Sequence, residues 1–307
     1  KKGGKMMSKR MKIIIAYDGS SYSDAAIEDL RRSGLPQEGD AVIISVADIS
    51  KTSIPSSDEI CVLGKHVSTR LLEETVALTQ REKASARNKA IKLAIRGGRG
   101  VLENLPGWRV KNQIAVGNPA EELLRMADEF KPDLIVVGSH GRSAIGRFFL
   151  GSVSQKVAEG ANCSVRIGRQ GSEKRMGAQN KVIIGASSLP DAEEVIRAVS
   201  RRAWAEDTEI RLIVSDNGIS AGRVSAVYPY AKAIFEQSVE VLRATTGAQV
   251  SVAIRSGETE SILLEEAENW KADSIFLVNE REIEEKGLGK LAANLLTGAK
   301  CTVEIVR

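Results

Sequence analysis

Cysteine, histidine and aromatic residues are scarce in this sequence, and their scarcity excludes several classes of protein. The 307 residues include three cysteines, two histidines and 4% aromatic residues. Cys61, Cys163 and Cys301 are odd in number and lie far apart, which suits a reducing compartment and not a disulfide framework. His66 and His140 do not combine with them at any recognised zinc-ligand spacing. The sequence therefore predicts neither a disulfide scaffold nor a structural metal.

The chain also lacks long apolar runs and a concentrated basic segment. No apolar run approaches the roughly 20 residues that span a bilayer, and residues 1–10 lack the apolar core of a signal peptide. The net charge of +4 comes from basic residues scattered among nearly as many acids, without the basic face typical of nucleic-acid binding. We therefore expect a cytoplasmic protein with no membrane or nucleic-acid partner, in which residues 1–10 are a disordered tail or an expression remnant.

What the chain does contain is a diverged internal repeat. The stretch "KIIIAYDGS" from Lys12 resembles "KVIIGASS" from Lys181, and both predict a buried first strand. The segment from Gly107 aligns without gaps on the segment from Gly247, and each reads as strand, turn, amphipathic helix and strand. Strands that alternate with helices in this way predict two α/β domains with parallel sheets and right-handed crossovers.

The first repeat is longer than the second. The first strands are offset by 169 residues and the later segments by 140, so the first half carries 29 extra residues between Ser50 and Pro106. The excess predicts a loop over residues 50–59 and a long polar helix over 67–96, which is a candidate partner or dimer surface. The glycine-rich "GGRG" at 97–100 predicts the end of that helix and a turn, and less favourably an RNA-binding fragment.

Domain boundaries follow from the repeat and from composition. The segment "GRQGSEKRMGAQN" is polar, contains glycine and lacks apolar periodicity, so we expect a linker at 169–180. The first domain then covers residues 11–168 and the second covers 181–307.

The stretch "GSHGRSAIGRFFLGSVSQKV" from Gly138 is the strongest candidate site. Gly138 directly follows the buried strand "DLIVV", and a helix is predicted from Gly151 onward. A glycine loop that leads into a helix N-terminus presents unpaired backbone N–H groups, which bind anions. Gly138 and Gly141 would let a phosphate approach the backbone closely.

A second candidate lies at the end of the first strand, in "AYDGSSYSDAA". Ligands of open α/β sheets bind at the carboxyl ends of strands, where the strand order reverses. Asp18 could therefore hydrogen-bond a ribose hydroxyl or an adenine amino group there. The alternative is an Asx turn or N-cap for the helix that follows, and the residues alone favour neither.

These residues carry a resemblance to a known family. The spacing Gly138-x2-Gly141-x9-Gly151-Ser152 is similar to the signature of ATP-binding members of the universal stress protein (UspA) family, as are "AYDGS" and "NPAEELLRMADEFKPDLIVVGSHG". The likeness is close over 11–168 and weak over 181–307. It implies two tandem Rossmann-like domains, each a five-stranded parallel sheet of order 3-2-1-4-5 flanked by helices.

The resemblance also implies a ligand and its contacts. The expected ligand is ATP, with or without Mg²⁺, in the first domain. Asp18 and the backbone around Ala16 would meet adenine or ribose, and Val46 would contact adenine through its main chain. The expected contacts to the ribose and phosphates are Val137, Gly138, Gly141, Arg142, Gly151, Ser152, Val153 and Ser154. Arg142 either adds a cation to this cradle or faces solvent.

The second half has lost the same pattern. Ser187 stands at the position of Asp18, and Val278 and Arg281 stand at those of Gly138 and Gly141. Two residues are missing before Gly289, and the acidic "EREIEE" would repel ATP. We expect no nucleotide in the second domain.

A second domain that keeps its core without its site is expected to be structural. The resemblance implies that the last strands, "CSVRI" and "CTVEI", pair antiparallel within the chain, and it allows a homodimer in addition. Cys163 and Cys301, which open these strands, are expected to be small buried apolar residues rather than redox sensors.

The function most consistent with these features is nucleotide binding in a regulatory or stress-response protein. A slow ATPase is an alternative, but the sequence has no Walker lysine, no evident carboxylate for Mg²⁺ and no evident catalytic base, so no catalytic residue is assigned. His140 could orient a water molecule, although a ring that packs or faces solvent is the favoured interpretation. A non-nucleotide scaffold is the third hypothesis, against which Asp18 and Ser152 argue.

Overall fold

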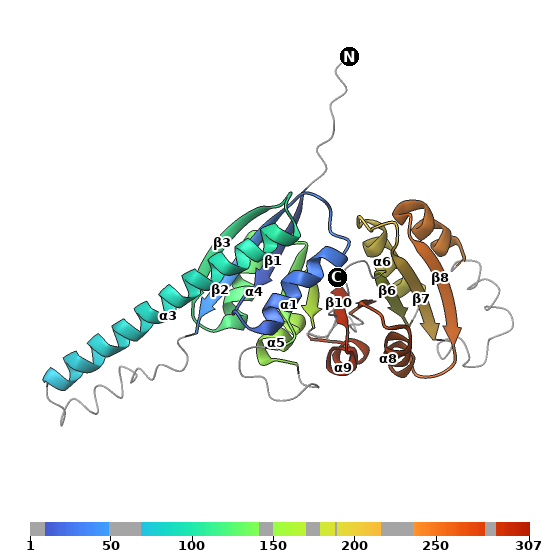
Figure 1. Cartoon of the computed structure of the whole chain (residues 1–307). Coiled ribbons are helices and arrows are strands. Elements are labelled where there is room, and N and C mark those ends of the chain that lie inside the picture. The colour runs from blue at the N-terminus through green and yellow to red at the C-terminus, as the bar shows by residue number, and fades with distance from the viewer. Residues whose placement is uncertain are drawn as a thin grey trace, which may run out of the picture.

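The computed structural model describes residues 10–48, 69–140, 150–169, 179–187, 189–215, 236–279 and 287–307. Figure 1 shows the two halves side by side, with the C-terminus between them. Predictions that concern Cys61, His66, Gly141, Arg142 or Arg281 lie outside the described residues, as do the loop at 50–59 and "EREIEE".

The first half alternates strands and helices in the predicted order. Its elements are β1 (Met11–Ala16), α1 (Ser21–Glu28), the 3-10 helix η1 (Asp29–Arg32), β2 (Gly39–Ala47), α3 (Thr69–Asn104), β3 (Arg109–Val116), α4 (Pro119–Phe130), β4 (Leu134–Gly138), α5 (Ser152–Gly160) and β5 (Ser164–Gly168).

The second half repeats this order. Its elements are β6 (Lys181–Ala186), α6 (Leu189–Ser200), β7 (Glu209–Ser215), a helix over 236–246, β8 (Gln249–Arg255), α8 (Thr259–Trp270), β9 (Ser274–Val278), α9 (Lys290–Gly298) and β10 (Thr302–Val306). Among the helices described in both halves, none combines the length and the apolar character that a bilayer span requires.

All ten strands form one sheet, in the order β3-β2-β1-β4-β5-β10-β9-β6-β7-β8. Each half therefore has the order 3-2-1-4-5, and its strands pair parallel. The predicted fold class, two tandem Rossmann-like domains, is confirmed. The halves join where β5 pairs antiparallel with β10, and Arg166 lies directly opposite Glu304.

The core is divided differently on the two faces of the sheet. On one face, buried residues of α4, α5, α8 and α9 and the strands beneath them form a single apolar cluster that runs through both halves. On the other face, the first half has its own cluster under α1 and α3, and the second half has another under α6 and the helix over 236–246. The two halves thus share a core on one face only.

The glycine-rich "GGRG" does not end a helix, so that prediction was wrong. Helix α3 continues through Gly97, Gly98 and Gly100 to Asn104. The glycines bring the helix close to the sheet, because a Cβ built on Gly97 would lie 2.8 Å from Cγ of the Tyr17 ring and 3.1 Å from Cγ2 of Ile43. Close packing outweighs the low helix propensity of glycine here.

Among the described side chains of α3, those that pack on the sheet lie in its C-terminal part. Ala90, Ala94 and Val101 are buried, whereas the side chains described between Leu78 and Lys89 are exposed or half-buried. Figure 1 shows the N-terminal part of α3 projecting away from the first half. The predicted helix is confirmed, and its role as a partner or dimer surface stays a prediction.

Two alanine substitutions in α3 should change stability in opposite directions. Gly97→Ala should lower the free energy of unfolding by about 1–2 kcal/mol, because overpacking against Tyr17 costs more than the helix propensity of alanine returns. Gly100→Ala should raise it by up to about 1 kcal/mol, because the nearest atom to its Cβ is Cγ2 of Ile27 at 3.4 Å. Urea unfolding measures both, and two stabilising substitutions would contradict the packing explanation.

Candidate functional site

The predicted site residues gather at one edge of the first half's sheet. Strand β1 lies between β2 and β4, and all three run parallel. Their carboxyl ends carry Ala16, Val46 and the pair Val137 and Gly138, so these residues share the edge. This is the point at which the strand order reverses, where open α/β sheets bind ligands.

Asp18 begins the turn that leads from β1 into α1. Its Oδ1 atom accepts hydrogen bonds from Ser20 N at 2.9 Å and from Ser20 Oγ at 2.6 Å. Ser20 in turn caps α1, because its Oγ accepts from Ser23 N at 3.2 Å. The structure thus contains the Asx turn that was one of the two readings of Asp18. Both bonds use Oδ1, so the turn does not require the second carboxylate oxygen.

Helix α5 starts beside the end of β4. The Ser154 hydroxyl donates to the carbonyl of Gly138 at 2.6 Å, and Gly151 N donates to the carbonyl of Ser139 at 2.8 Å. Gly151 is the N-cap, at the start of the helix predicted from Gly151 onward, and among the described residues no side chain caps the helix. The first backbone N–H groups of α5 are therefore oriented as an anion site requires.

Gly138 is constrained by the protein itself. A Cβ built on it would lie 2.8 Å from the carbonyl carbon and oxygen of Tyr22 and 2.9 Å from Ser23 N. Glycine is therefore required for α1 to pass closely over the end of β4. This requirement is independent of any ligand, and close approach of a phosphate to Gly138 stays a prediction.

His140 is packed inside this edge. Its ring is buried, lies 4.8 Å from the Tyr22 ring between centroids, and places Nδ1 3.1 Å from Ser139 Oγ. Nε2 is buried and has no hydrogen-bond partner in the described part of the chain. Burial, together with the positive charge of Arg169, lowers the pKa of His140 below its usual value. The favoured interpretation, a ring that packs, agrees with this geometry.

Sequence reasoning missed a cluster that ties α3 to this edge. The Tyr17 hydroxyl donates to Asp24 Oδ1 at 2.5 Å, and Arg96 of α3 donates to Asp24 Oδ2 at 2.6 Å. Burial and the hydrogen bond to Asp24 raise the pKa of Tyr17. Tyr17 stands beside Asp18 in the quoted "AYDGS", but the contact with Arg96 spans 72 residues and leaves no local signal.

The corresponding loop of the second half is closed by a side chain. Asn279 follows β9, donates from Nδ2 to the carbonyl of Gly287 at 3.0 Å, and accepts from Gly289 N at 2.9 Å through Oδ1. It therefore bridges the start of α9. Val278 stands in place of Gly138, and Ser187 in place of Asp18 donates to Asp191 Oδ2 at 3.0 Å.

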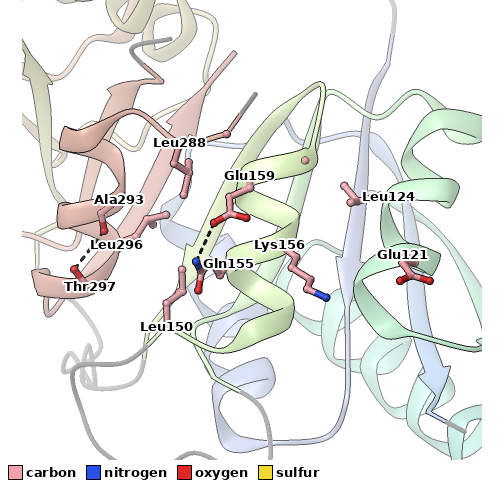
Figure 2. A pocket seen from close by; sticks show the side chains of 12 residues that line it. Glu121, Leu124, Leu150, Gln155, Lys156, Glu159, Leu288, Ala293, Leu296 and Thr297 are labelled. Atoms are coloured by element: carbon pink, nitrogen blue, oxygen red, sulfur yellow. Dashed lines mark hydrogen bonds between the residues drawn. The ribbon is translucent and has the colours of Figure 1, made fainter. Parts of the chain in front are cut away.

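A separate hollow lies between the halves. A cavity of about 800 Å³ is lined by residues of α4, α5 and α9. Figure 2 shows the side chains that line it. Leu124 and Lys156 line it from the first half, and Leu288 and Leu296 line it from the second. Among the described residues, none of the predicted nucleotide contacts lines this cavity.

Within the described ranges, no group of three or more histidine, cysteine or acidic side chains is arranged to hold a metal. Cys301 is buried and Cys163 is half-buried. Burial raises the pKa of Cys163 to about 11 and that of Cys301 to about 12. Both therefore stay protonated at neutral pH, as expected of small packed residues.

Comparison with known proteins identifies the family. The model of the universal stress protein family matches residues 9–169, which is just over half of the chain. The chain belongs to the universal stress protein family. Universal stress protein YxiE of Bacillus subtilis is 28% identical over 158 residues, which cover 52% of this chain and 98% of YxiE. Universal stress protein MJ0577 of Methanocaldococcus jannaschii is 28% identical over 159 residues, or 51% of this chain and 93% of MJ0577.

A solved structure extends the likeness to the whole chain. A universal stress protein from Archaeoglobus fulgidus superposes with a TM-score of 0.63 and covers 96% of this chain and 98% of its own. Its sequence is 17% identical, so the likeness shows the fold. The whole chain therefore shares the fold of that protein, with two tandem Rossmann-like halves.

The environment of His140 predicts a dependence of stability on pH. Its pKa is lower in the folded protein than in the unfolded chain, where it is about 6.5, so the unfolded chain binds the proton more readily. Stability from this group is complete above about pH 7 and is lost as the pH falls through about 6.5 and below. His140→Gln should flatten the decline in the free energy of unfolding between about pH 7 and 5 in urea titrations. His66→Gln controls for the loss of an imidazole, and an unchanged slope in His140→Gln would contradict a ring held neutral.

Proposed function

We propose that this universal stress protein binds one ATP per chain, with or without Mg²⁺, at the carboxyl edge of β1, β2 and β4 in the first domain. The second domain is structural, and nucleotide occupancy serves a regulatory or stress-response role. The boundaries that this implies are 11–168 for the nucleotide-binding domain, 169–180 for the linker and 181–307 for the degenerate domain.

The observation that carries the proposal is the contrast between the two equivalent loops. In the first half, the start of α5 has no side-chain cap among the described residues and shares its edge with a carboxylate, Asp18. In the second half, the N-cap Gly289 likewise has no capping side chain, and its N–H is bonded to Asn279 as that of Gly151 is bonded to the Ser139 carbonyl. What differs is the ligand edge, where Ser187 replaces Asp18 and donates to Asp191. A helix dipole contributes only about 0.3–1 kcal/mol to anion binding, so the backbone N–H groups in the first turn of α5 must supply most of the phosphate contacts.

The proposed contacts follow the family resemblance. Asp18 and the backbone at Ala16 bind the ribose or adenine, and the main chain of Val46 binds adenine. The proposed ribose and phosphate contacts are Val137, Gly138, Gly141, Arg142, Gly151, Ser152, Val153 and Ser154. Gly141 and Arg142 belong to the part of this loop that lies outside the described residues.

Binding without efficient hydrolysis fits the geometry better than catalysis does. The side chain best placed to orient a water molecule, His140, is buried and packed at a tilt against the Tyr22 ring. A ring fixed in this way supports the packing of α1 and is not free to follow a reacting group. The proposal therefore assigns no catalytic residue.

Calorimetric titration of ATP into the full chain tests the proposal, with an expected stoichiometry of one. Asp18→Ala should weaken binding at least tenfold, which corresponds to about 1.4 kcal/mol. Ser187→Ala, at the equivalent position of the second half, is the matched control and should leave binding unchanged. Asp18→Asn keeps the oxygen that accepts from Ser20 but loses the charge, so it separates the turn from the ligand contact.

Three outcomes would contradict the proposal in different ways. Two ATP per chain would show that the second domain binds nucleotide. No binding would favour a non-nucleotide scaffold. Phosphate release above a protein-free blank that is lost in His140→Ala would support a slow ATPase.

A further inference from the structure

The two halves meet at a point of near two-fold symmetry. Arg166 of β5 lies directly opposite Glu304 of β10 in the antiparallel pair. The two residues occupy equivalent positions of the repeat, because Cys163 and Cys301 align with the same offset of 138. The pseudo-two-fold axis therefore passes between an arginine and a glutamate.

These side chains belong to a buried network of four charges. Arg166 is fully buried, donates from Nε to Asp29 Oδ2 at 2.6 Å and from Nη1 to Glu304 Oε2 at 2.9 Å. Arg202 donates to the other carboxylate oxygen of Glu304 and, at 2.6 Å, to the carbonyl of Ser33. Asp29 also accepts from the Thr302 hydroxyl at 3.1 Å. Two positive and two negative groups therefore balance inside the interface.

None of the four charges is repeated in the other half. At the offset of 169, Asp29 corresponds to Ala198, and Ser33 corresponds to Arg202. The structure supports this alignment, because the same backbone hydrogen bond occurs in both halves. Ser33 N donates to Leu30 O, and Arg202 N donates to Val199 O. Two copies of the first half paired through β5 would place Arg166 against Arg166 and lose the bond to Glu304. Two copies of the second half would place Glu304 against Glu304.

Like charges opposite one another in a ladder are unfavourable, and burial increases the cost. Asp29 would still neutralise Arg166 within a first-half pair, and Arg202 would neutralise Glu304 within a second-half pair. Net charge therefore does not distinguish the pairings. The contact at the axis does, because only the mixed pair joins opposite charges there.

Two further cross-interface contacts are symmetric and provide an internal comparison. Arg169 donates to the carbonyl of Leu296 near the end of α9, and Arg307 donates to the carbonyl of Ala158 near the end of α5. Arg169 and Arg307 are equivalent at the offset of 138, as are Ala158 and Leu296. Each half thus caps the last helix of the other, and a homologous pair would keep both caps. These contacts stabilise the pairing without selecting a partner.

We propose that the Arg166–Glu304 pair, with Asp29 and Arg202, makes each last strand selective for the opposite half. The β5 surface accepts a β10 surface, from its own chain or from a second copy, and rejects another β5. A second copy that binds this tandem chain must then exchange halves or use a different surface.

Cleavage of the linker in the folded protein tests this selectivity. A protease site placed within residues 170–178 yields nicked full-length protein, which is unfolded in urea, refolded and weighed by native mass spectrometry. The wild-type halves should reassociate only as mixed pairs. The variant D29A/R166M/R202S/E304M removes all four charges, and its halves should approach the statistical distribution, in which homologous and mixed pairs are equally abundant.

The matched control is R169M/R307M, which removes the two symmetric caps. It should weaken every kind of pair and still give mixed pairs only. Homologous pairs in the nicked wild-type protein would overturn the proposal, and so would a charge-free variant that reassociates only as mixed pairs. If the four-fold variant does not fold, D29N/R166Q/R202Q/E304Q, which removes the same four charges with polar side chains, is read by the same criteria.

Discussion

The antiparallel pairing of β5 with β10 is the constraint on which the rest of this structure depends. It turns two five-stranded sheets into one sheet of ten strands and covers an edge of each that would otherwise be open to other chains. It also brings α5 and α9 onto one continuous apolar core. The buried charges at its centre are costly to desolvate, so they stabilise the pair only while all four partners are in place.

Under the proposed function, this arrangement explains how the second half can lack a nucleotide site and still contribute to the fold. The second half supplies a sheet edge, half of a shared core and the carbonyl that Arg169 caps, and none of these contributions requires a ligand. After β9, the Asn279 side chain instead bonds to Gly287 and Gly289. The first half presents Gly138 and a carboxylate, Asp18, at the sheet edge where the proposed nucleotide would bind.

The sequence predicted the parts of this account that depend on periodicity and on repeats. Buried β-branched runs such as that of β1 identify their strands, and the family resemblance supplied the strand order. The glycines at 97–100 led to the wrong prediction that the helix ends there. Their role is close packing of α3 against Tyr17, which is a contact between segments about 80 residues apart. Three other contacts could not be predicted from the sequence either, because each depends on side-chain placement in three dimensions. They are Arg96 with Asp24, Asn279 with Gly289 and Arg166 with Asp29.

The central claim is that the two halves form one structural unit through this interface. Pulsed hydrogen exchange across a urea titration of the unmodified protein tests it most directly, with mass spectrometry of peptides from β1 and from β6. The account predicts that both strands lose protection with the same midpoint, because the shared core and the buried charges open together. Separate midpoints, with one half still protected while the other exchanges, would contradict it.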